Sequence, residues 1–257
     1  MVSVNLWTLG PIVLGWIELA LGRPDEALKL GQEGTRRARE LAEPLSTTAS
    51  LYSFAAQRYE RNEPEAVREL VEAAVALAQE NGFRDFLASA RALRAWAMSE
   101  LGHAIEGIAE LEAILASLPY LQYVSKALLL AKVYLHVGRF DEALVLLDEE
   151  LARCEPLGAH QEKAELYRLK GEAILMRDSS AVAEAEKCFR KAIEIARGQS
   201  AKWWELRATV SLARLLAKRG KRDEARAMLD EIYNWFAEAF DTADLKDAKA
   251  LIDELGA

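Results

Sequence analysis

The sequence predicts an all-α protein built from repeated helical hairpins, on three observations. Ala, Leu, Glu and Arg dominate the composition, and these residues favour helix. Only 14 Gly and 6 Pro occur among 257 residues, and no segment alternates apolar and polar residues with the period of a strand. One short sequence also recurs between apolar helical segments, at residues 22–28, 138–144 and 220–226.

The recurring sequence has the properties of a tight turn between two antiparallel helices. Its three copies read GRPDEAL, GRFDEAL and GKRDEAR. The glycine lets the chain leave one helix through a left-handed residue. The acidic pair then lies in the first turn of the next helix, where it complements the helix dipole. The alanine is small enough for the two helices to approach closely.

Small residues at these turns define an internal repeat. Their spacings are 39, 41, 36, 42 and 40 residues along the series Ala27, Ala66, Gly107, Ala143, Ala185 and Ala225. Twelve residues before each lies a second position that is mostly small, occupied by Gly15, Phe54, Ala95, Ala131, Ala173 and Ala213. This pattern resembles the tetratricopeptide repeat, a helix-turn-helix unit with small residues at its eighth and twentieth positions. That unit has about 34 residues, so the helices or loops here are longer. The resemblance implies a right-handed superhelical solenoid.

The expected elements follow in order. Six hairpins are predicted at about residues 4–42, 45–81, 84–118, 120–154, 159–197 and 200–239. A last helix at about 243–255 follows Thr242, a suitable N-cap, and its apolar residues form one stripe. One buried face and one charged face are typical of a capping helix. The sequence thus predicts a single repeat domain over residues 1–257.

The first helix is apolar on nearly all sides. It lacks the basic segment and cleavage pattern of a signal peptide, and it contains Pro11 and Glu18, so a buried helix is favoured over a membrane span. Either something covers it, namely a second copy of the chain or an upstream domain, or it packs against the second hairpin alone.

The charge distribution is asymmetric. The formal charge of −8 argues against a general nucleic-acid binder. Residues 160–222 nevertheless contain 15 Lys or Arg and 8 Asp or Glu, a net charge of +7. This segment is the best candidate for a binding surface.

The sequence shows no sign of catalysis, a metal site or a cofactor. Cys154 and Cys188 lie in helical segments and read as reduced packing residues, which suits a cytoplasmic protein. His103, His136 and His160 are isolated from each other and from cysteine, and paired acids lie at helix surfaces and starts. A non-enzymatic protein is predicted.

Four longer segments carry a wider resemblance. They are residues 164–172 (AELYRLKGE), 183–192 (AEAEKCFRKA), 206–215 (LRATVSLARL) and 240–251 (FDTADLKDAKAL). Together they resemble the C-terminal tetratricopeptide region of large bacterial regulators that join a class III adenylate or guanylate cyclase domain to an ATPase and a repeat tail. The resemblance implies a regulatory module without the catalytic parts, and no phosphate-binding Gly-x-x-x-x-Gly-Lys-Ser/Thr sequence occurs.

The repeat resemblance also implies a concave groove lined by the first helix of each hairpin. Its predicted partner-binding residues are basic and aromatic: Arg58, Tyr59, Trp96, Lys132, Tyr167, Lys170, Arg177, Arg207, Arg214 and Lys218. The cations would grip carboxylates of an acidic protein segment, and the aromatic rings would supply rigid contact area. The predicted function is therefore protein–protein interaction. Three alternatives stay open: a solvated face without a ligand, a sensor arm that binds a small effector inside the superhelix, and a self-associating spacer.

Overall fold

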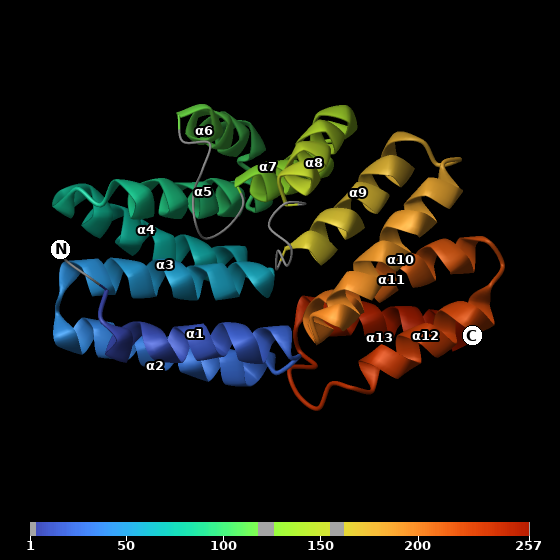
Figure 1. Cartoon of the computed structure of the whole chain (residues 1–257), viewed down its shortest axis with the longest axis horizontal. Coiled ribbons are helices and arrows are strands. Elements are labelled where there is room, and N and C mark those ends of the chain that lie inside the picture. The colour runs from blue at the N-terminus through green and yellow to red at the C-terminus, as the bar shows by residue number, and fades with distance from the viewer. Residues whose placement is uncertain (1–3, 118–125, 155–161, 257) are drawn as a thin grey trace. The chain divides into compact units, whose positions relative to one another are not determined.

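A computed structural model describes residues 4–117, 126–154 and 162–256 of the chain (Figure 1). These parts contain thirteen α-helices and no strand. The all-α prediction is therefore confirmed.

Contacts divide the chain into two compact units. The first comprises residues 1–19 and 24–133, and the second comprises residues 20–23 and 134–257. Helices α1 to α6 are Leu6–Ala20, Pro24–Leu41, Pro44–Glu60, Pro64–Asn81, Arg84–Glu100 and Ala104–Ser117, and α7 is Lys126–His136. Helices α8 to α13 are Phe140–Cys154, Lys163–Arg177, Val182–Gly198, Lys202–Lys218, Arg222–Tyr233 and Ala243–Gly256. In the first unit each helix from α2 to α6 packs against the next in sequence, and in the second unit the helices from α8 to α13 do the same (Figure 1).

The turns between helices have the predicted chemistry. Gly22, Gly138 and Gly220 have φ angles of 82°, 82° and 78°, the left-handed region that glycine enters at little cost. Helices α2, α3 and α4 each begin with proline, which suits the first helical position because its missing N–H would be unpaired there anyway.

Small residues at the turn positions allow close helix packing. A methyl group on Gly107 would lie 2.5 Å from the carbonyl oxygen of Ala95, on the neighbouring helix of the hairpin. The second hairpin instead has the large Phe54 where most hairpins have a small residue. Its ring fills the space opposite Gly31, where an added methyl carbon would lie 2.2 Å from the ring. Large and small residues have therefore exchanged places across the α2–α3 contact.

The last helix behaves as a cap of the second unit. Its stripe is buried against α11 and α12, and comprises Leu245, Ala248, Leu251, Ile252 and Leu255. Over the ranges given above, no helix has both the length and the apolar character needed to cross a membrane.

Candidate functional site

The predicted groove residues divide between the two units. In the first unit they lie on α3 (Arg58 and Tyr59), α5 (Trp96) and α7 (Lys132). In the second unit they lie on α9 and α11, and comprise Tyr167, Lys170, Arg177, Arg207, Arg214 and Lys218.

The first unit packs its groove residues into an aromatic cluster with two cations. Tyr59 and Trp96 are only 1% and 2% exposed, and their rings meet edge to face with centroids 4.7 Å apart. The Lys132 Nζ lies 4.4 Å from the centre of the Tyr59 ring, a cation–π contact. Arg58 lies over Phe54 and forms an ion pair with a neighbouring glutamate. The two buried rings stabilise the helix stack, while Lys132 and Arg58 lie at its edge.

In the second unit, carboxylates on adjacent helices pair with four of the predicted cations. Lys170 Nζ lies 2.6 Å from Asp148 of α8, and Arg177 Nη1 lies 3.6 Å from Asp141 of the same helix. On the other side, Arg207 Nη2 lies 2.9 Å from Asp244 of α13, and Arg214 pairs with Asp247. These pairs could not be predicted from sequence alone, because the partners are 22 to 37 residues apart in the chain.

The four pairs differ in burial. Arg207 is 9% exposed, so its pair with Asp244 is largely withdrawn from water. Arg177 and Arg214 are 44% and 46% exposed, and ion pairs at such positions contribute little stability. Arg207 is therefore held in a largely buried pair, while Arg177 and Arg214 remain accessible to solvent.

A further charge network lies beneath Arg207. Arg168 donates two hydrogen bonds to Glu165, of 2.7 and 2.8 Å, and one to Glu172, which also accepts from Ser211 of α11 at 2.9 Å. Burial opposes the charge on Arg168, but the two glutamates outweigh it and raise the pKa of its guanidinium well above the usual value. The network ties α9 to α11.

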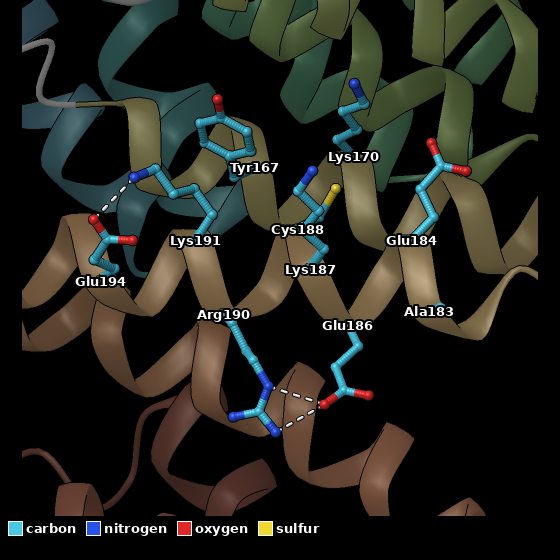
Figure 2. A pocket seen from close by; sticks show the side chains of 10 residues that line it. All are labelled: Tyr167, Lys170, Ala183, Glu184, Glu186, Lys187, Cys188, Arg190, Lys191 and Glu194. Carbon is cyan, nitrogen blue, oxygen red and sulfur yellow. Dashed lines mark hydrogen bonds and ion pairs between the residues drawn. The ribbon is translucent and has the colours of Figure 1, made fainter.

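A hollow of about 740 Å³ opens beside α9 and α10 (Figure 2). Tyr167 and Lys170 contribute to it from α9, so two of the predicted groove residues are brought together here. The Tyr167 hydroxyl points to the same side of α10 as the amines of Lys170, Lys187 and Lys191 (Figure 2). The sequence prediction missed the two α10 lysines because they belong to the second helix of their hairpin.

The hollow also contains opposite charge. Glu184, Glu186 and Glu194 line it, and Lys191 pairs with Glu194 at 2.9 Å. Glu186 points with Arg190 away from the lysines (Figure 2). Burial disfavours the charged form of Lys170, but the hydrogen bond and charge of Asp148 outweigh that effect and raise the pKa of its ammonium. The lysine side of the hollow is therefore cationic at neutral pH.

One thiol, that of Cys188, lines the hollow. Burial raises the pKa of the Cys188 thiol, whereas a nucleophilic cysteine needs a lowered pKa. Within the described parts of the chain, no three His, Cys, Asp or Glu residues lie where they could hold a metal ion. The ammonium groups, the tyrosine and the apolar stems of the lysines suit a ligand with carboxylate and apolar parts.

Comparisons with known proteins identify the repeats. One tetratricopeptide repeat model matches residues 123–198, and a second matches residues 12–30 and 206–231. No curated protein sequence matches the chain.

Solved structures share the fold at low sequence identity. NprR in complex with its cognate peptide NprX is 14% identical with a TM-score of 0.61, over 99% of this chain and 73% of that chain. A Rap protein complexed with competence and sporulation factor is 13% identical with a TM-score of 0.61, over 100% and 76%. Repeats of a putative kinesin light chain from Podosopora anserina are 22% identical with a TM-score of 0.51, over 79% and 96%. The chain therefore contains tetratricopeptide repeats in an all-α solenoid fold.

Proposed function

We propose that the chain is a non-catalytic protein-interaction module that binds an acidic segment of a partner protein. The hollow beside α9 and α10 is its anchoring point. The observation that carries the proposal is the convergence of Tyr167 with Lys170, Lys187 and Lys191 on one side of α10. The NprR structure, which contains a bound peptide, is a precedent for this use of the fold.

The chemistry of the hollow favours an acidic segment over a neutral one. Lys187 is exposed, so its ammonium could bind a partner carboxylate without any rearrangement of buried side chains. Lys170 would exchange Asp148, which is 55% exposed, for a carboxylate of the partner. Tyr167 is half-buried and adds a rigid aromatic contact.

The remaining groove residues extend this proposal along the first helices of the hairpins. Arg177 and Arg214 can exchange their exposed aspartate partners in the same way, and Lys218 is exposed at the end of α11. We place the module in the cytoplasm, where its two free cysteines would stay reduced. The segments that resemble cyclase–ATPase regulators favour a signalling role.

A small acidic effector is the second candidate ligand, on one specific observation. The volume of about 740 Å³ lies within the range of small-molecule sites, roughly 300–1,000 Å³. In this case the chain would be the sensor arm of a signalling ATPase or cyclase system.

The test begins with a random peptide library displayed against the full chain. Affinities of the enriched peptides are then measured by calorimetry for the wild type and for Lys187→Glu. The control is Lys29→Glu on α2, which has the same charge change at a residue that is 69% exposed. We expect acidic peptides whose binding weakens about tenfold or more with Lys187→Glu, weakens with added salt, and is unchanged by Lys29→Glu.

Two results would contradict the proposal. Equal binding of the enriched peptides to both variants and the wild type would move the site away from the hollow. In the second, no peptide is enriched, and small dicarboxylates raise the melting temperature of the wild type but not of Lys187→Glu. That result would identify a small acidic effector, rather than a protein segment, as the ligand.

A further inference from the structure

The first helix has one buried face and one open apolar face. Thr8, Pro11, Ile12, Gly15 and Leu19 are buried. Contacts with the next two helices fix this orientation. Gln57 of α3 donates a 2.7 Å hydrogen bond to the Ile12 carbonyl oxygen. Gly34 of α2 lies so close that an added methyl carbon would be 2.5 Å from the Ile12 side chain. The opposite face exposes its large apolar residues by 49% to 81%: Leu6, Trp7, Val13, Leu14 and Ile17.

In a later repeat, the residues equivalent to this open face are buried. The positions of Trp7, Gly10, Leu14 and Ile17, counted from Gly15, correspond in α11 to Glu205, Ala208, Leu212 and Leu215. All four α11 residues are buried, and α10 packs against that helix. Helices α3, α5 and α9 likewise have a helix packed before them. No helix precedes α1 in the described residues, so its equivalent face stays open.

We propose that this face pairs with the same face of a second copy of the chain, as two antiparallel α1 helices. Trp7, Gly10, Leu14 and Ile17 follow one another at spacings of three, four and three residues, the pattern of a helix–helix seam. Helix α1 contains a single charged residue, Glu18, which lies outside this seam. From α2, the Arg37 guanidinium lies over the Trp7 ring, 5.4 Å from its centre, at the N-terminal end of the seam. An antiparallel pair would place the two Arg37 groups at opposite ends of the seam, apart from each other.

Residue sizes select the antiparallel orientation. Around Gly10 there is open space, because an added methyl carbon would meet nothing within 4 Å. In an antiparallel pair symmetric about residue 12, Gly10 faces Leu14 of the second copy and Trp7 faces Ile17. Each leucine then enters the gap over a glycine. A parallel pair would instead place glycine on glycine, which leaves a gap, and tryptophan on tryptophan, which causes a steric clash. The antiparallel arrangement also places the positive end of each helix dipole beside the negative end of the other, which is favourable.

The pairing predicts a weak dimer. One helix pair is smaller than a standard protein interface, so we expect a dissociation constant on the order of 1–100 µM. Sedimentation equilibrium on the full chain measures it directly. Leu14→Asp should leave a monomer at all concentrations tested, because it buries a carboxylate in the seam. Its control, Ile105→Asp, removes a side chain that is 84% exposed on α6 and should leave the dimer unchanged.

Gly10→Leu separates this pairing from general apolar association. The substitution enlarges the apolar face, which strengthens non-specific association, but it fills the gap that receives Leu14. We expect dimerisation to weaken at least tenfold. Circular dichroism of each variant shows whether the fold is retained. The changes should be tolerated, because Leu14 and Ile105 are exposed and an added carbon on Gly10 would meet nothing within 4 Å.

Disulfide cross-linking tests the orientation. A mixture of Gly10→Cys and Leu14→Cys chains should form a mixed disulfide faster than either chain alone, since antiparallel pairing places these positions opposite each other. A wild type that stays monomeric to about 1 mM, a dimer that survives Leu14→Asp, or one strengthened by Gly10→Leu would overturn the proposal. Preferential cross-linking of Gly10→Cys to itself would overturn the antiparallel orientation.

Discussion

Gly107→Ala tests whether the small turn residues are packing constraints. The new methyl carbon would lie 2.0 Å from the Ser99 hydroxyl and 2.5 Å from the Ala95 carbonyl oxygen. The hydroxyl is itself fixed by a 2.9 Å hydrogen bond to the Ala95 carbonyl, and Ser99 is 1% exposed. Restoring an ordinary contact of 3.4 Å to the backbone oxygen requires α5 and α6 to separate by about 0.9 Å. The clash involves backbone, so rotation of a side chain cannot relieve it.

The expected loss of stability follows from two opposing terms. Overpacking a core costs about 1–3 kcal/mol, and the backbone contact places this site at the upper end. Alanine is better than glycine within a helix by about 1 kcal/mol, which offsets part of that cost. The free energy of unfolding should therefore fall by about 2 kcal/mol, and the melting temperature by about 4–8 °C.

Urea titration followed by circular dichroism at the helix band measures this change. The matched control is Gly198→Ala, at the last residue of α10, where the added methyl carbon would meet nothing within 4 Å. We expect the control to be neutral or stabilised by up to about 1 kcal/mol. If Gly107→Ala is as stable as the wild type while the control behaves as expected, the close approach of α5 and α6 is not the reason for the small residue.

Three further predictions concern a cap, an ion pair and the thiols. Glu43→Ala should lower the free energy of unfolding by about 1 kcal/mol, because the carboxylate caps the start of α3. Hydrogen bonds lower the pKa of Glu43. The difference in free energy of unfolding between the wild type and Glu43→Ala should therefore be full above the ordinary glutamate pKa, and it should vanish as pH falls through the lowered value. Arg207→Ala should cost about 2 kcal/mol in urea unfolding, since Asp244 loses a charged hydrogen-bond partner. Cys154 and Cys188 should react with a thiol reagent at pH 8 only after unfolding, because both are buried and burial raises their pKa values; rapid labelling of the folded chain would contradict this.

Local chemistry made the fold predictable. The left-handed glycines, the acidic first turns and the small turn residues each act on a few neighbouring residues, and the structure confirms the first of these in the φ angles of Gly22, Gly138 and Gly220. Even the apparent exception at Phe54 is explained once Gly31 is seen opposite it. The periodic sequence pattern fixes which side of a helix is buried, because burial depends mainly on helix period and residue size.

The candidate site was less predictable because its electrostatics depend on side chains from other helices. The repeat pattern assigned Tyr167 and Lys170 to one surface, and both line the hollow. The pattern gave no indication that Asp148 pairs with Lys170 or that Lys187 lies beside it. The repeat pattern also assigned Trp96 to the groove, whereas this residue is only 2% exposed. Sequence position determines the direction of a Cα–Cβ bond, while pairing depends on how far a long side chain extends and on the tilt of the next helix.

The paired cations change what kind of ligand the module can bind. Since Lys170, Arg177 and Arg214 each have a carboxylate neighbour, a partner gains only the difference between its own carboxylates and the aspartates that it displaces. Exposed ion pairs contribute about 0–1 kcal/mol, so this exchange costs little but also gains little. Affinity must then come from the apolar contacts in the hollow and from Lys187, whereas the paired cations discriminate against basic segments. Removing an aspartate should therefore strengthen binding: Asp148→Asn, which frees Lys170, is expected to raise the affinity for an acidic peptide several-fold. A decrease in affinity would mean that Asp148 positions the lysine rather than competing for it.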